Sequence, residues 1–139
     1  MIEFHFELDF QLINEPKYSD WVNRILTSEG FEAGQIDYIF CTDEYLLEIN
    51  KKYLNHDTLT DIITFDYTNG EVVSGDIFVS VDRVKDNAQR FDVDVNNELL
   101  RVMSHGLLHL MGYGDKKDEE VVLMRSKEDE KIKMFHVEQ

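Results

Sequence analysis

The sequence predicts one α+β domain over residues 1–139, with about four strands in a mixed sheet and helices packed over that sheet. Three observations support this prediction: strict apolar–polar alternation at the start of the chain, an Asn-Gly pair between two β-branched runs, and apolar residues at helical spacing elsewhere. The chain is long enough to bury one core. It has no linker rich in proline, glycine or serine that would separate two domains.

Alternation and β-branched runs predict the strands. Apolar residues alternate with polar ones from Ile2 to Phe10, as in a half-buried strand. Three further runs are rich in β-branched and aromatic residues, at positions 36–41, 62–67 and 72–81. Asn69-Gly70 lies between the last two runs, and this pair is typical of a β-hairpin turn.

Apolar residues at helical spacing predict the helices. The first helix begins near Pro16, which suits a first helical turn, and ends before Gly30. Thr42 is expected to cap the second helix. Three more helices are predicted over residues 82–91, 96–111 and 118–135.

Composition limits the possible functions. The net charge of −15, from 29 acidic and 14 basic side chains, repels nucleic acids at long range. A polyanionic substrate would therefore need a basic patch, a bound metal ion or a partner protein. The single cysteine, Cys41, excludes an internal disulfide and a thiolate zinc cluster, and its apolar surroundings predict burial. There is no basic leader and no apolar run long enough for a bilayer, so we expect a soluble cytoplasmic protein.

His105 and His109 are the strongest functional signal. Four residues are close to one helical turn, so both rings point the same way from the helix over 96–111. This helix is apolar on most sides and is therefore expected to be buried, where histidines need polar partners. A metal ion would satisfy both rings, and a hydrogen bond from each ring to a carbonyl or carboxylate is the alternative. Gly106 costs about 1 kcal/mol in a helix interior, which indicates that another group approaches the backbone closely there.

A third ligand follows the helix. Gly112 and Gly114 can adopt positive φ and turn the chain back, which brings Asp115 within reach of the two rings. Two imidazoles and a carboxylate leave one position open on a tetrahedral zinc ion, as in catalytic sites. Metalloproteases of the H-E-x-x-H type need a glutamate where Gly106 lies. The pattern therefore favours a hydrolase that uses metal-activated water.

Three segments together carry a resemblance to a known family. Residues 105–115 read His-Gly-Leu-Leu-His-Leu-Met-Gly-Tyr-Gly-Asp, residues 49–53 and 60–65 read Ile-Asn-Lys-Lys-Tyr and Thr-Asp-Ile-Ile-Thr-Phe, and residues 74–79 read Ser-Gly-Asp-Ile-Phe-Val. They resemble H-G-x-L-H-L-x-G-Y-D-H, L-N-x-x-Y-R…T-D-V-L-S-F and L-G-D-I-x-I of the YbeY family, over about residues 42–127. The resemblance implies a zinc-dependent, single-strand-specific endoribonuclease. Its expected roles are maturation of the small-subunit ribosomal RNA 3′ end and ribosome quality control, with that RNA, the small subunit and its proteins as partners.

Two positions depart from the family pattern. The third ligand histidine of the family falls on Asp115, which lowers the charge of the site by one and favours manganese or another harder ion beside zinc. The family's arginine after the tyrosine, which the resemblance assigns to the RNA-cleaving cleft, falls on Leu54.

Another cation is needed in place of that arginine. Arg101 lies four residues before His105 on the same helical stripe, so we expect it to contact the scissile phosphate. Lys52 and His56 are further candidates, and pairing of Arg101 with an acid is the alternative. The two aspartates that match family positions are assigned supporting roles: Asp61 as a turn cap and Asp76 as a hydrogen-bond partner of a histidine.

Two other functions stay open at this level. One is a metal-dependent hydrolase of another substrate, such as a peptide or a small ester. The other is a non-catalytic, acidic ribosome-assembly factor in which the metal ion is structural.

Overall fold

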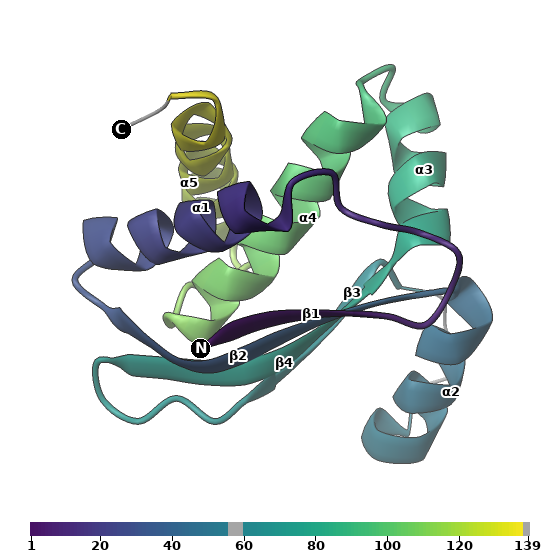
Figure 1. The fold of residues 1–139 in the computed structure, drawn as a ribbon, viewed down its shortest axis with the longest axis horizontal. Coiled ribbons are helices and arrows are strands. Elements are labelled where there is room, and N and C mark those ends of the chain that lie inside the picture. The colour runs from purple at the N-terminus through teal and green to yellow at the C-terminus, as the bar shows by residue number, and fades with distance from the viewer. Residues whose placement is uncertain (56–59, 138–139) are drawn as a thin grey trace.

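The computed structural model describes residues 1–55 and 60–137, and the elements follow the predicted order (Figure 1). The strands within these residues are β1 (Ile2–Phe6), β2 (Glu32–Cys41), β3 (Ile62–Asp66) and β4 (Val72–Ser80). The helices are α1 (Glu15–Ser28), α2 (Asp43–Leu54), α3 (Val81–Arg90), α4 (Val95–Leu110) and α5 (Asp118–His136).

The strands form one mixed sheet in the order β1-β2-β4-β3. β2 pairs parallel with β1 and with β4, whereas β3 pairs antiparallel with β4. The β3–β4 hairpin closes through a bridge between Asn69 and Val72, and Gly70 has a φ of +62°. The predicted α+β fold with a four-stranded mixed sheet is confirmed.

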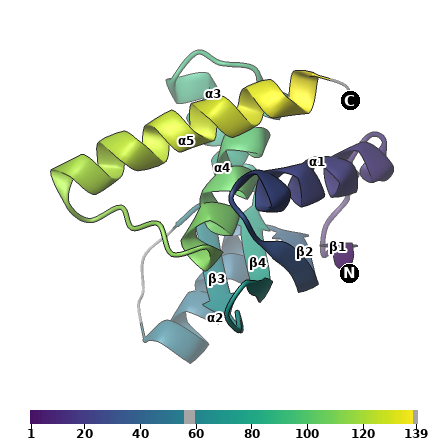
Figure 2. The ribbon, with the colours of Figure 1, turned by 90° about the vertical axis from the view of Figure 1, so that its left-hand side faces the viewer.

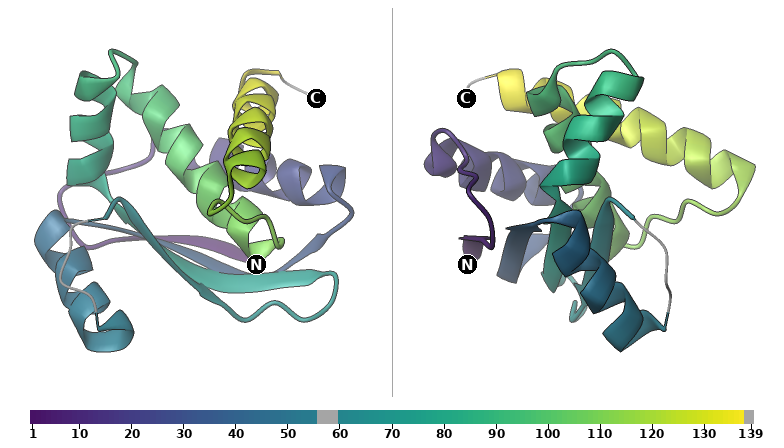
Figure 3. Two further views of the ribbon diagram at one scale, coloured as in Figure 1. Left: turned by 180° about the vertical axis from the view of Figure 1, so that it is seen from behind. Right: turned by 90° about the vertical axis from the view of Figure 1, so that its right-hand side faces the viewer.

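Helices cover the two faces of the sheet unequally. α1, α3, α4 and α5 lie over one face, and α2 lies against the other (Figure 1, Figure 3). The main core fills the space between the sheet and the larger group of helices. A smaller cluster under α2 contains Cys41, Leu46 and Ile63, so the predicted burial of Cys41 is confirmed. Within the described ranges, no helix has the length and apolar character needed to cross a membrane.

α4 lies between the sheet and α5 and is buried along most of its length (Figure 2). Tyr38 on β2 donates its hydroxyl to the carbonyl of Met103 on α4 at 3.1 Å. Gly106 marks a close approach, because a Cβ there would lie 2.6 Å from Ile62 Cδ1 and 2.9 Å from Ile77 Cγ2. The predicted close contact at Gly106 is therefore confirmed, and the group that approaches is the sheet.

Two predicted strand boundaries differ from the structure. The alternating pattern runs to Phe10, but β1 ends at Phe6 because the chain bends over residues 7–9. Phe10 still packs on Phe40 with ring centroids 5.6 Å apart, so the alternation there reflects burial rather than strand pairing. β2 begins at Glu32 rather than at residue 36, since the segment before Ile36 pairs with the start of β4 across a register shift.

Gly106→Ala is expected to destabilise the protein, because the new methyl group would overlap Ile62 and Ile77 unless α4 moves off the sheet. Alanine favours a helix by about 1 kcal/mol over glycine, whereas overpacking typically costs about 1–3 kcal/mol. The methyl group would overlap two side chains, so we expect the upper part of that range, about 2–3 kcal/mol, and hence a net loss of about 1–2 kcal/mol. Urea denaturation of the metal-free protein measures the free energy of unfolding. Gln89→Ala on the exposed face of α3 is the control, expected to shift it by less than about 0.5 kcal/mol. Wild-type stability of Gly106→Ala would contradict the close packing.

Candidate metal centre

Three side chains bring their ligand atoms together at the C-terminal end of α4. The Nε2 atoms of His105 and His109 lie 3.0 Å apart. Asp115 Oδ2 lies 3.3 Å from His105 Nε2 and 3.2 Å from His109 Nε2. The structure thus gathers the three residues that the sequence predicts as metal ligands.

The triangle of these atoms fits a tetrahedral metal ion. Ligands bound to zinc at about 2.0–2.1 Å lie about 3.3–3.4 Å from one another at tetrahedral angles. The observed edges of 3.0, 3.2 and 3.3 Å are close to that separation. Three electron-pair donors at such distances repel one another unless a cation or a proton lies among them. Among the described residues, this group offers three ligand atoms. A tetrahedral zinc ion bound by them would therefore have a fourth coordination position for water or substrate.

A helix end and a tight turn position these ligands. His105 and His109 lie one turn apart on α4, which ends one residue after His109. Gly112 then adopts a φ of +100°, and its N–H donates to the carbonyl of His109 at 3.0 Å. The predicted reversal is confirmed at Gly112, but the positive φ predicted for Gly114 is wrong. A Cβ at Gly114 would lie 2.5 Å from a carboxylate oxygen of Glu120, so the end of that side chain would have to move to admit a larger residue.

An ion-pair cluster holds the turn that carries Asp115. Tyr113, two residues earlier, donates its hydroxyl to Glu29 Oε1 at 2.6 Å. Lys127 and Lys131 donate to Glu29 Oε2 at 3.0 and 2.7 Å. Burial alone would raise the pKa of Glu29, but these hydrogen bonds, led by that from Lys131, lower the pKa to about 2. Glu29 is therefore ionised, and it ties the turn to the end of α1 and to α5.

Glu128 on α5 is a site residue that the sequence pattern does not reveal. Its buried Oε2 lies 2.6 Å from Nδ1 of His105. A carboxylate accepts hydrogen bonds, so in the neutral ring Nδ1 carries the proton and Nε2 keeps its lone pair for a metal ion. Burial would lower the pKa of His105, but the hydrogen bond and charge of Glu128 outweigh burial, and the pKa is raised. Glu128 thus sets which nitrogen of His105 faces the ligand group.

Arg101 lies one turn before His105 on α4, but its guanidinium is bound to acids. Nη1 donates to Glu128 Oε1 at 2.9 Å, and Nη2 donates to Asp129 Oδ1 at 2.7 Å. The two oxygens of Glu128 are therefore both used, one by Arg101 and one by His105. Pairing with an acid is the alternative that the sequence leaves open for Arg101, and its contact with a scissile phosphate stays a prediction.

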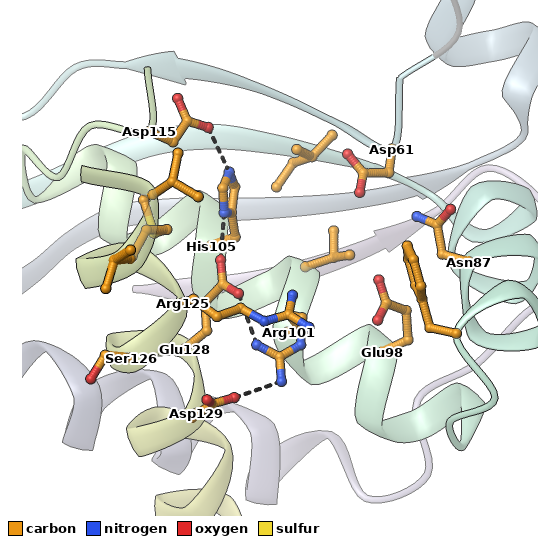
Figure 4. A pocket seen from close by; sticks show the side chains of 16 residues that line it. Asp61, Asn87, Glu98, Arg101, His105, Asp115, Arg125, Ser126, Glu128 and Asp129 are labelled. Carbon is orange, nitrogen blue, oxygen red and sulfur yellow. Dashed lines mark hydrogen bonds and ion pairs between the residues drawn. The ribbon is translucent and has the colours of Figure 1, made fainter. Parts of the chain in front are cut away.

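A cleft of about 970 Å³ opens beside the ligands (Figure 4). His105 and Asp115 lie toward one end of the view, and Asp61, Asn87 and Glu98 lie toward the other. Burial raises the pKa of the Asp61 carboxyl and, likewise, that of Glu98. Asp61, expected from the sequence to cap a turn, thus places its side chain in the cleft.

Asp76 does not take the role that the sequence suggests. Its strand neighbours Gly75 and Ile77 face α4, so Asp76 points from the opposite face of the sheet. There it accepts a hydrogen bond from the Tyr67 hydroxyl at 3.2 Å. The prediction that Asp76 orients a histidine is therefore wrong.

Leu54, at the position of the missing family arginine, and the neighbouring Lys52 do not line this cleft. Leu54 is exposed at the end of α2 and does not belong to the described lining of the cleft. The Lys52 ammonium lies 5.3 Å from the ring centroid of Tyr53 on the same helix. His56, the other proposed cation, lies outside the described residues.

Comparison with known proteins gives one family. The family model described as Endoribonuclease YbeY matches residues 3–136. An Endoribonuclease YbeY of Flavobacterium johnsoniae is 60% identical over 100% of both chains, and that of Flavobacterium psychrophilum is 55% identical over 100% of this chain and 99% of the relative. A Thermotoga maritima protein solved in solution matches with a TM-score of 0.68 over 97% of this chain and 89% of that one. At 24% identity, this last likeness shows the fold alone.

Glu128→Gln is expected to weaken metal binding. The amide replaces one of the two carboxylate oxygens with an NH₂ group, and Arg101 can only donate, so the remaining oxygen is expected to face Arg101. The NH₂ group then faces His105 Nδ1, which favours a His105 ring protonated on Nε2. Loss of such a partner typically lowers metal affinity about 10- to 100-fold, and we expect a loss of that size. Competition with a chromophoric chelator measures the zinc affinity, and ¹⁵N NMR of the metal-free protein reports which ring nitrogen carries the proton.

The matched control is Glu119→Gln, which removes the same charge from the exposed first turn of α5. This variant should bind zinc as the wild type does. Equal zinc affinity for Glu128→Gln and the wild type would contradict the role assigned to Glu128.

Proposed function

The chain belongs to the YbeY endoribonuclease family, and on that premise we propose that it is a metal-dependent endoribonuclease that cuts single-stranded RNA. The proposal includes zinc as the cofactor and maturation of the small-subunit ribosomal RNA 3′ end, with ribosome quality control, as the cellular role. Ribosomal RNA, the small subunit and its proteins are the proposed partners, and the cytoplasm is the proposed location. The observation that carries the proposal is the convergence of three ligand atoms beside a cleft.

The residues around the cleft have distinct tasks in this proposal. His105, His109 and Asp115 would hold the ion, with Glu128 keeping the His105 ring in the required orientation. A bound divalent ion supplies Lewis-acid polarisation of a phosphoryl oxygen and a water of lowered pKa. Asp61 lines the same cleft, where its carboxyl can accept or donate a hydrogen bond at the bound strand.

The exposed apolar side chains of the cleft support a preference for single strands. Phe91 lines the cleft and is 59% exposed, so its ring is accessible to an unpaired base. Val121 and Val122 on α5 add exposed apolar surface to the same lining. Bases stack on such rings only when they are not already stacked in a duplex.

The acidic character of the chain supports docking on a larger particle. A net charge of −15 opposes long-range attraction to free RNA. Contacts with ribosomal proteins would bring the enzyme to its RNA without many phosphate contacts, and the metal ion would supply local positive charge in the cleft.

Metal analysis combined with an RNA cleavage assay tests this function. We expect the wild type to bind one zinc ion per chain and to cut a short single-stranded RNA, and we expect a chelator to abolish cleavage until zinc is restored. His105→Ala should lose both the ion and the cleavage, because it removes one of three ligands.

Other outcomes separate the alternatives. Zinc-dependent hydrolysis of an ester or peptide with no RNA product would favour a different metallohydrolase. Normal ribosomal RNA processing in cells that carry His105→Ala would favour an assembly factor and contradict the nuclease proposal.

A further inference from the structure

Two arginines, Arg101 and Arg125, supply the permanent positive charge in the described lining of the cleft. The lining is otherwise rich in carboxylates, from Asp61, Glu98, Asp115, Glu128 and Asp129. A strand of RNA in this cleft places phosphate groups among those acids. Its binding therefore depends on which cation is available to meet a phosphate.

Arg101 is not available in the structure. Its guanidinium donates to Glu128 and to Asp129, and its side chain is only 14% exposed. To meet a phosphate, Arg101 would have to give up charge-assisted hydrogen bonds and leave the buried carboxylate of Glu128 without that partner.

Arg125 differs from Arg101 in both respects. It is exposed on α5, three residues before Glu128 and hence on the same face of the helix. Among residues 1–55 and 60–137, no side chain or backbone group forms a hydrogen bond or an ion pair with Arg125. Its charge still reaches into the cleft, because it acts against the larger effect of burial, which raises the pKa of Glu98. Figure 4 shows the Arg125 side chain extending from α5 toward the middle of the cleft.

From this difference we infer that Arg125 is the residue that binds a phosphate of the RNA strand held in the cleft. The inference rests on the proposed ribonuclease function and names a contact within it. A guanidinium binds two phosphate oxygens at once through its planar fork of N–H donors. Arg125 can do so without breaking an existing pair, whereas Arg101 keeps Glu128 in place for His105. The two arginines of the cleft thus have separate tasks: Arg101 positions Glu128, and Arg125 binds a phosphate of the RNA.

The test compares Arg125→Met with Lys133→Met. Lys133 is also exposed on α5 but lines a separate pocket, so the control removes the same charge away from the cleft. Binding of a short single-stranded RNA is measured in chelator at several salt concentrations, and cleavage is measured with zinc. Zinc content and melting temperature of each variant establish that the fold and the metal site are intact.

We expect Arg125→Met to bind the RNA about tenfold or more weakly, and the slope of log affinity against log salt to decrease by about 0.7, the value for one phosphate contact on a single strand. KM should rise by a similar factor, with zinc content unchanged. Lys133→Met should match the wild type, and Arg125→Lys should recover part of the affinity because it restores the charge without the planar fork.

Three results would overturn the inference. In the first, Arg125→Met keeps the wild-type affinity and salt slope while the wild type binds and cuts RNA, which leaves the proposed function standing. In the second, Lys133→Met loses as much affinity as Arg125→Met, which means that RNA affinity depends on the net charge of the protein and not on a contact of Arg125. In the third, the wild type neither binds nor cuts RNA, which removes the proposed function together with the inference.

Discussion

The hydrogen bond between His105 and Glu128 is the contact on which the candidate metal centre depends. It joins α4, which carries two ligands, to α5, which otherwise contributes apolar and charged surface to the cleft. A buried carboxylate is costly unless it is paired, and Glu128 is paired twice, with His105 on one oxygen and Arg101 on the other. The same arrangement favours the proton of the neutral His105 ring on Nδ1, so that Nε2, 3.0 Å from Nε2 of His109, offers its lone pair to a metal ion. The packing of α5 on α4 therefore also determines how His105 presents Nε2 to a metal ion.

The excess of negative charge explains why the cations of the cleft have divided tasks. Most acidic side chains in the described residues are exposed, but Asp61 and Glu98 line the cleft, where burial raises the pKa of each carboxyl. A polyanion entering such a cleft needs a metal ion and a free guanidinium. Arg101 is bound to Glu128 and Asp129, so the phosphate contact is the one proposed for Arg125.

Local sequence patterns predicted most of the fold and the ligand residues, because those features depend on neighbours in the chain. The hairpin at Asn69-Gly70 and the histidines one turn apart on a buried helix are of this kind. Contacts between distant segments were not predictable. Glu128 lies 23 residues after His105 in a charged tail, where a solvated acid is the ordinary expectation, and only the packing of α5 on α4 buries it. The prediction for Asp76 was wrong for the same reason. Which face of β4 meets α4 depends on how the helix packs on the sheet, and the local sequence does not determine that packing.

X-ray absorption at the zinc edge tests the central claim most directly, because it reports the ligands of the bound ion without an activity assay. Protein loaded with one equivalent of zinc should show four nitrogen or oxygen ligands at about 2.0–2.1 Å, with scattering from two imidazole rings and one exchangeable solvent position. A zinc environment without imidazole scattering, or one closed by a fourth protein ligand, would contradict the convergence of His105, His109 and Asp115 on an open catalytic ion.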